Sequence, residues 1–204
     1  MYPNILNTNQ KELLGLVQKF RREYYLVGGT AISLILGHRR SIDFDLFKYS
    51  AINPKRIIEK ISKSGFEYKI TRRVSEQLNV IINQVTFTFY QYPFKINARK
   101  DFQNICRVPD LLTLAAMKSY ALGRRSKWKD YVDLYMIIKD HYTIEQISKK
   151  ANEIFGEMFS EKMFRTQLSY FEDIDYSEEI DYLIPEIPKD TIKIFLQEKA
   201  TEIY

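Results

Sequence analysis

Hydrophobic and polar positions divide the chain into a first part with mixed periodicities and a second part with helical periodicity. Apolar residues recur at the i, i+3, i+4, i+7 spacing from Leu13 to Phe20, which predicts an amphipathic helix of about three turns. Asn9, followed three positions later by Glu12, predicts the start of this helix. The apolar run at residues 24–27 predicts a buried strand directly after it.

Strands then alternate with helices as far as residue 92. The pattern predicts strands at residues 42–47, 67–74, 79–82 and 85–90, and helices at residues 31–36 and 53–64. Asn83-Gln84 is expected to form a turn, and Gly65 to end the second of these helices. Residues 93–108 have weak periodicity, and we expect a connection there with one short edge strand.

From Pro109 onwards the pattern is helical. It predicts helices starting at residue 109 and near residues 127–139, 143–154, 157–170 and 189–203. The whole pattern predicts an α+β (α/β) fold, with a small mixed twisted sheet flanked by helices and then a helical C-terminal part. We place the sheet domain at residues 1–105 and the helical domain at residues 106–204.

Composition narrows the class of protein. The chain has 204 residues, 45% of them hydrophobic, which is enough to bury a core. Its one cysteine, Cys106, excludes a disulfide framework and is expected to be an inert buried thiol. No signal peptide is apparent at the start, and no apolar run approaches the roughly 20 residues of a membrane span. We therefore expect a cytoplasmic protein without a membrane partner.

Charge is unevenly distributed along the chain. Residues 171–190 hold eight acidic residues and one lysine, a local charge of −7, which leaves +12 on the rest of a chain of net charge +5. Basic pairs recur at residues 21–22, 39–40, 72–73 and 124–125. This distribution suits polyanions such as nucleoside triphosphates or RNA. Alternatively, the basic pairs are solvated faces and the acidic segment folds back against them.

A glycine pair and two carboxylates carry the candidate chemistry. Gly28-Gly29 follow the first strand, where the backbone must turn and can approach a ligand closely. Thr30 stands at the expected helix start, where its hydroxyl could cap N–H groups or face a phosphate. Asp43 and Asp45 alternate with Phe44, so their side chains leave one face of a strand, about 6 to 7 Å apart along the backbone. Carboxylates placed in this way suit a divalent metal ion.

The stretch from Gly28 to Asp45 resembles the nucleotidyltransferase superfamily that includes DNA polymerase beta and kanamycin nucleotidyltransferase. Within it, the AbiEii/AbiGii toxin-type family is most similar. The residues that carry the likeness are Gly28-Gly29-Thr30-Ala31, Gly37-His38-Arg39-Arg40-Ser41 and Asp43-Phe44-Asp45. The resemblance implies that Asp43 and Asp45 are catalytic and bind metal, and that Gly28, Gly29, Thr30 and Arg39 bind nucleotide. Alternatively, the glycines form a helix cap and the Asp-x-Asp pair is a solvated strand end. In that case none of these residues binds a ligand.

A second block of the chain extends the resemblance. Lys118 lies on an otherwise apolar helix stripe, where an unpaired ammonium would be costly. Asp130 and Asp133 follow in a Lys-Asp-x-x-Asp helix, within expected reach of Lys118. In the family such a block supports the nucleotide site, so the resemblance implies that Lys118 holds triphosphate oxygens and that Asp130 or Asp133 orients it. A helix–helix salt bridge without ligand is the alternative.

The resemblance implies transfer of a nucleotidyl group. Mg²⁺ or Mn²⁺ would be the cofactor and a nucleoside triphosphate the substrate, with RNA, such as tRNA, or a protein as acceptor. A cognate antitoxin is an implied partner; the preferred base, the acceptor, the oligomeric state and the role of residues 141–204 stay open. Two other classes also remain open: an inactive nucleotide-binding relative, and a basic RNA-binding protein that makes no use of its Asp-x-Asp pair.

One position departs from the family pattern. Relatives usually carry a third carboxylate on a strand shortly before a Tyr-Pro pair, and here Tyr92-Pro93 is preceded by a run without any acid. Thr88 takes the expected place by spacing. A threonine cannot act as a general base at neutral pH. We therefore expect nucleotide binding with slow or absent transfer, unless a partner or another acid such as Asp101 compensates.

Overall fold

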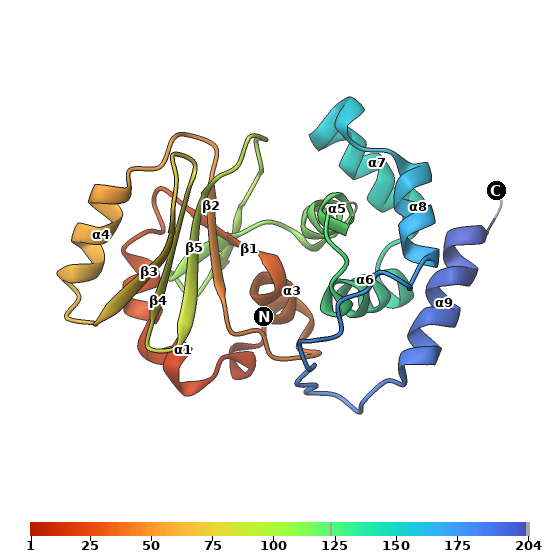
Figure 1. Cartoon of the computed structure of the whole chain (residues 1–204), viewed down its shortest axis with the longest axis horizontal. Helices are drawn as coiled ribbons and strands as arrows, with labels where there is room; N and C mark the ends of the chain where they lie inside the picture. Colours follow the sequence, from red (N-terminus) through yellow and green to blue (C-terminus); the bar gives the residue numbers. More distant parts are fainter. Residues whose placement is uncertain (123, 203–204) are drawn as a thin grey trace. The chain divides into compact units, whose positions relative to one another are not determined.

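The computed structural model describes residues 1–122 and 124–202. The chain forms two compact units, residues 1–110 and residues 111–204 (Figure 1). The first contains all the strands of the sheet and the second is helical. The predicted α+β class and the predicted order of sheet first and helices second are confirmed.

The first unit is built on a mixed seven-stranded sheet in the order β3-β4-β5-β2-β1-β7-β6. The strands are β1 (Tyr25–Val27), β2 (Phe44–Lys48), β3 (Tyr68–Arg73), β4 (Gln77–Ile82), β5 (Val85–Gln91), β6 (Lys100–Phe102) and β7 (Cys106–Val108). Strand β2 pairs in parallel with β5, and β1 in parallel with β7, whereas the other neighbours are antiparallel. Asn83 and Gln84, both at positive φ, form the two-residue turn between β4 and β5, as predicted.

The first unit also contains five helical segments. They are η1 (Pro3–Ile5), α1 (Thr8–Glu12), α2 (Leu14–Gln18), α3 (Gly28–Leu36) and α4 (Pro54–Ser62). Rings of Phe20, Tyr24 and Phe89 meet at centroid distances of 4.7 to 5.9 Å, and Phe44 and Phe87 pack 5.2 Å apart. All five rings are buried, so they hold the segment between α2 and β1 against β5, and β5 against β2.

The predicted first helix is wrong in two respects. Its N-cap is Asn7, whose side chain accepts from the N–H of Gln10 in a reciprocal capping box, and not Asn9. The helix is also divided, because α1 ends at Glu12 and α2 begins at Leu14. The apolar spacing survives the division, since the residues from Leu13 to Phe20 that the pattern selected are buried.

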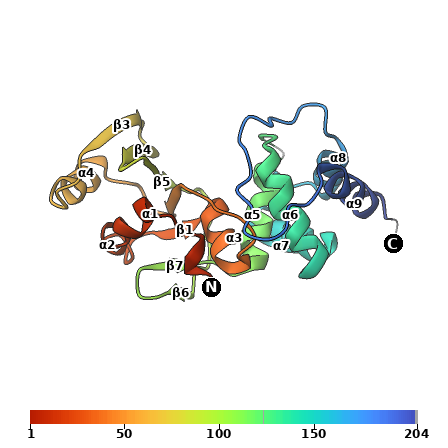
Figure 2. The same ribbon diagram turned by 90° about the horizontal axis from the view of Figure 1, so that it is seen from below.

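The stretch at residues 93–108 contains two short strands where one was expected. β7 lies beside the central strand β1, with Tyr25 opposite Arg107, and β6 forms the sheet edge (Figure 2). The contacts divide the chain after Asp110, so β7 belongs to the sheet unit. The predicted boundary after residue 105 would fall just before this strand.

The second unit contains five α-helices among the described residues. They are α5 (Leu111–Leu122), α6 (Trp128–Asp140), α7 (Ile144–Phe155), α8 (Glu161–Ser169) and α9 (Lys189–Thr201), with η2 (Gly156–Met158) between α7 and α8. Helix α7 is capped by Thr143 in a capping box with Gln146. Across the described part of the chain, no helix has the length and apolar character needed to cross a membrane.

Candidate nucleotide site

Gly28 brings the turn after β1 into contact with Asp45. A Cβ atom at Gly28 would lie 2.1 Å from Oδ2 of Asp45, and Gly28 has a φ of +72°. Only glycine combines this backbone conformation with such a close approach. The carboxylate therefore lies directly over the N-terminus of α3, where the helix dipole favours a negative charge.

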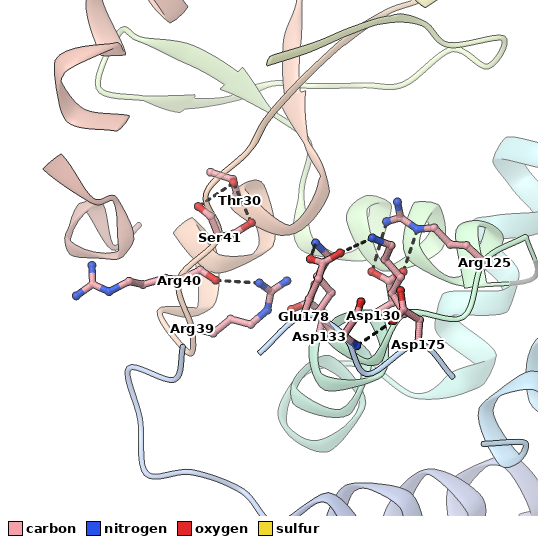
Figure 3. Close-up of polar contacts among 12 residues, drawn as sticks. Thr30, Arg39, Arg40, Ser41, Arg125, Asp130, Asp133, Asp175 and Glu178 are labelled. Atoms are coloured by element: carbon pink, nitrogen blue, oxygen red, sulfur yellow. Dashed lines mark hydrogen bonds and ion pairs between the residues drawn. The ribbon is translucent and has the colours of Figure 1, made fainter. Parts of the chain in front are cut away.

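Of the two roles considered for Thr30, the structure tests the capping of helix α3. Helix α3 begins at Gly28 with Val27 as its N-cap and no side-chain cap, so Thr30 lies inside the first turn. Its buried hydroxyl donates to the carbonyl oxygen of Asp43 and lies 3.0 Å from Oγ of Ser41 (Figure 3). Capping by Thr30 is thus wrong, and the hydroxyl holds the backbone that leads into β2.

Arg39 lies against the second glycine of the turn. A Cβ atom at Gly29 would be 2.7 Å from Nη2 of Arg39 and 2.9 Å from Oγ of Ser41. Nη1 of Arg39 donates to the carbonyl oxygen of Arg40 at 2.9 Å, and the arginine is buried (Figure 3). The structure therefore brings Arg39, Ser41 and the glycine turn together.

Burial alternates through Asp43, Phe44 and Asp45, and the shared face of the two carboxylates stays a prediction. Phe44 is buried on the apolar face, whereas Asp43 and Asp45 are half-buried at the alternate positions. Asp43 lies just before β2, which begins at Phe44. Among the residues that the structure describes, no group of three or more histidine, cysteine or acidic side chains is placed to hold a metal ion.

Thr88 lies directly beside Asp45 on the neighbouring strand. In the parallel pairing of β2 with β5, Asp45 is opposite Thr88, and cross-strand partners share a face of the sheet. Asp101, the other acid considered for this place, lies in the edge strand β6 and pairs with Arg21 at 2.6 Å. Strands β7 and β1 separate it from β2, so Asp101 does not supply an acid next to Asp45.

In the second unit, Lys118 meets both of its predicted acidic neighbours. Its Nζ lies 2.7 Å from Oδ1 of Asp130 and 2.9 Å from Oδ2 of Asp133, and all three side chains are buried. Arg125 also contacts Asp130, at 3.1 Å (Figure 3). Burial alone would raise the pKa of Asp130, but the charges of Lys118 and Arg125 more than offset it and hold this pKa below its usual range.

Part of the acidic segment folds back on the basic residues at the start of α6. Glu178 pairs with Lys127 and with Lys129, and the backbone of Asp175 bridges to Lys127. Burial would raise the pKa of Glu178, but the hydrogen bonds from the two lysines lower it overall. Internal pairing, which the sequence left as an alternative, therefore accounts for these two lysines.

Sequence reasoning missed two participants in these clusters. In the sequence, Ser41 ends the Gly37–Ser41 motif and Arg125 belongs to a basic pair, and neither position indicates a contact partner. The role of Ser41 depends on the path of the loop between α3 and β2, for which the sequence has no periodic signal. Arg125 precedes Asp130 by a non-helical turn, so helix spacing could not pair them.

The residues of the first unit fit a hard divalent cation. Mg²⁺ takes one or two protein carboxylates and completes its shell with water and substrate phosphates. Asp43 and Asp45 are two half-buried carboxylates at alternate positions, and the glycine turn leaves the space above Asp45 free of a Cβ atom. Cys106, by contrast, is buried with its pKa raised by desolvation to about 12, and it has no place in this donor set.

Known proteins share this architecture over nearly the whole chain. MenT4, a nucleotidyltransferase toxin from Mycobacterium tuberculosis, superposes with a TM-score of 0.63 at 13% identity, covering 94% of this chain and 80% of that one. JHP933 from Helicobacter pylori gives a TM-score of 0.60 at 14% identity, covering 94% and 88%. An uncharacterized protein of Aquifex aeolicus is 27% identical over 159 residues, covering 74% of this chain and 75% of its own.

The strand–turn–helix–strand unit, with its glycine pair and paired aspartates, and these structural neighbours define a protein of nucleotidyltransferase fold. The model of the AbiEii nucleotidyl transferase toxins of type IV toxin–antitoxin systems matches residues 14–203. The chain therefore belongs to the AbiEii family. The resemblance seen in the sequence is confirmed.

Proposed function

We propose that this protein transfers a nucleotidyl group from a nucleoside triphosphate to an RNA or protein acceptor, as the toxin of a toxin–antitoxin pair. The observation that carries the proposal is the contact of Gly28 with Asp45. It directs the N-terminus of α3 and one carboxylate at the same space. Backbone N–H groups at a helix N-terminus bind phosphate, and carboxylates bind the metal ion that accompanies it.

Each residue of the first unit has a proposed role. Asp43 and Asp45 hold Mg²⁺ or Mn²⁺, which when bound neutralises phosphate charge and orients the triphosphate. Gly28 and Gly29 admit the phosphates to the start of α3, with Arg39 beside them. Thr30 is a positioning residue, because its hydroxyl holds the backbone of Asp43. An acceptor hydroxyl attacks the α-phosphorus, the bond to the bridging oxygen breaks, and pyrophosphate leaves.

Lys118 is proposed to contact the outer phosphates, with Asp130 and Asp133 to orient it. The burial of its Nζ against both carboxylates equally supports a purely structural pair. With Thr88 beside Asp45, the acceptor proton has no carboxylate to receive it on the neighbouring strand. We therefore propose that nucleotide binding is intact and that transfer is slow, and an inactive nucleotide-binding relative is the alternative.

Asp43→Asn and Asp45→Asn test the proposal separately. Each is expected to abolish Mg²⁺-dependent binding of nucleotide with little loss of stability, because removing one of two neighbouring negative charges relieves repulsion. Isothermal titration with Mg–ATP, Mg–CTP, Mg–GTP and Mg–UTP, beside thermal unfolding, measures both effects. Asp140→Asn, an exposed change at the end of α6, is the control. Unchanged affinity in both site variants, with a wild type that binds, would refute the metal site.

The acceptor is identified by following the label. The protein is incubated with each α-labelled nucleoside triphosphate, Mg²⁺, total RNA and a protein extract. Label in RNA or in a protein band defines the acceptor class. Label in neither, with nucleotide binding intact, establishes the inactive relative.

A further inference from the structure

Aromatic side chains line one end of the sheet face that carries Asp45. Phe47 and Tyr90 are cross-strand partners on β2 and β5, with ring centroids 5.1 Å apart. Tyr92 lies 5.3 Å from the ring of Phe47 and 5.4 Å from that of Phe94. We call these four residues, Phe47, Tyr90, Tyr92 and Phe94, the aromatic ladder. Tyr92 is buried, and the other three are half-buried.

The ladder begins immediately beside the carboxylates. Phe47 is two positions after Asp45, and Tyr90 is two positions after Thr88. Alternation therefore places Asp45, Phe47, Thr88 and Tyr90 on the same face of the sheet. Two positions of a strand span about 7 Å, roughly the length of one nucleotide of an extended single strand. The rings pack edge to face or tilted against one another, which holds them in place without a ligand.

Positive charge lies at the edge of the same face. The strand pairings place Asp45, Thr88, Asn79 and Arg72 in one row across β2, β5, β4 and β3. Arg72 is thus three strand spacings, about 14 Å, from Asp45. Lys69, opposite Ile81, lies on the same face of β3, and both basic side chains are exposed.

This combination selects the chemical class of the ligand. Aromatic rings that stack bases, together with basic groups along a groove or edge, are the features by which proteins bind unpaired nucleic acid. In a duplex the faces of the bases are stacked on one another and cannot stack on the rings of the aromatic ladder. A folded protein acceptor would offer no row of phosphates to Lys69 and Arg72.

We propose that this face binds an unpaired segment of nucleic acid, with bases stacked on the half-buried rings of the aromatic ladder and backbone phosphates near Lys69 and Arg72. Binding of the segment stands independently of catalysis. Its use as the acceptor of transfer rests on the function proposed above.

Anisotropy of fluorescently labelled oligonucleotides tests the binding, without nucleoside triphosphate or Mg²⁺. The probes are a single-stranded RNA of about ten nucleotides, the same sequence as DNA, and the RNA duplex. Single strands are expected to bind more tightly than the duplex, and the RNA and DNA arms show whether the 2′-hydroxyl is read. Phe47→Leu and Tyr90→Leu keep an apolar side chain but remove the stacking ring, and each is expected to weaken binding roughly 5- to 150-fold.

Matched variants separate binding from folding. Tyr170→Leu removes a 50% exposed tyrosine in the helical unit and should leave affinity unchanged. Lys69→Gln and Arg72→Gln should each reduce the slope of log affinity against log salt by about 0.7, whereas Lys55→Gln, exposed on α4, should not. If a leucine variant unfolds, Phe47→Trp and Tyr90→Trp decide, because a larger ring should retain or strengthen binding.

Several results would overturn the proposal. Duplex bound as tightly as single strand, or ladder variants with wild-type affinity, would show that the rings only pack the sheet. Label transferred to a protein acceptor at the same rate in the ladder variants would refute the use of the bound segment as acceptor, and would leave the binding itself to the anisotropy result. Asp43→Asn separates the two proposals, since it should lose nucleotide and keep the oligonucleotide; loss of neither would count against the nucleotide site alone.

Discussion

At the scale of single residues, the candidate site depends on the lack of a side chain at Gly28. The missing Cβ lets Asp45 lie over the start of α3, and the positive φ turns the chain out of β1. The sequence predicted that a glycine is needed here, since a strand followed by Gly-Gly is a turn. It could not predict the partner, because Asp45 is brought there by the pairing of Val27 with Asp45 in the sheet.

Gly28→Ala is expected to destabilise the fold and to displace Asp45. Two costs combine: the left-handed conformation, about 1–2 kcal/mol, and the collision with the carboxylate, a further 1–3 kcal/mol. Gly65→Ala isolates the first cost, because Gly65 has a φ of +79° and nothing within 4 Å of an added Cβ. Urea unfolding measures both variants, and nucleotide titration measures the loss of the site.

A helical glycine supplies the opposite control. Gly15 lies in α2 with open space around it and an ordinary φ, so Gly15→Ala should stabilise the protein by about 0.5–1 kcal/mol. If Gly28→Ala costs no more than Gly65→Ala and still binds nucleotide, the contact with Asp45 has no functional role.

At the scale of elements, periodicity predicted most helices and strands, and failed where tertiary contacts decide. The N-cap is Asn7 and not Asn9. Gln10, its partner in the capping box, also donates from its side chain to the carbonyl oxygen of Ser41 in the loop before β2, a tertiary contact that periodicity does not show. Strand β7 was not predicted because a segment of three residues is too short to show a periodic pattern. It is a strand because it pairs with β1. The spacing before Tyr92-Pro93 was informative, since the residue that it selected, Thr88, lies opposite Asp45 in the structure.

Thr88→Asp is expected to start or accelerate nucleotidyl transfer. The new carboxylate would stand beside Asp45 on β5 and could accept the proton of the attacking hydroxyl, a contribution of about 10²- to 10⁴-fold in rate. Affinity for nucleoside triphosphate should change little. Thr86→Asp, which adds the same charge two positions earlier on the same face, is the control. A fast wild-type enzyme that Thr88→Asp leaves unchanged or slows would show that the chemistry needs no third acid.

Lys118→Met is expected to cost about 3–5 kcal/mol of stability, because it removes a buried cation that contacts two buried carboxylates, whereas the contact of Arg125 with Asp130 stays. Adding Asp133→Asn should recover part of the loss. Under conditions where the variant is folded, a phosphate-binding Lys118 predicts a larger loss of affinity for triphosphate than for monophosphate. Equal losses for both nucleotides would assign the lysine to the salt bridge between α5 and α6.

At the scale of the whole molecule, the sequence predicted two parts. It did not predict which charged side chains pair with one another and which face the solvent. Net charge is +5, yet Glu178 already neutralises part of the basic run at residues 127–129. Glu23 likewise faces Lys48, Arg56 and Lys60 at 2.9 to 3.8 Å. Such pairings depend on distant segments meeting, which composition alone does not reveal.

Acid should destabilise this protein in part by protonating the buried carboxylate of Asp130. The pKa of Asp130 is lowered in the folded state, so its contribution to stability is present above the unfolded value near 3.9 and is lost as pH falls through the lower folded value. Protonation also removes negative charge from a chain that already carries +5, and self-repulsion grows. Urea unfolding at intervals between about pH 7 and pH 2 should show stability declining below about pH 4. Asp130→Asn should be less stable at neutral pH, and its stability should depend less on pH below pH 4. The exposed change Asp140→Asn should follow the wild type. Equal slopes of stability against pH in all three proteins would show that Asp130 does not contribute to acid unfolding.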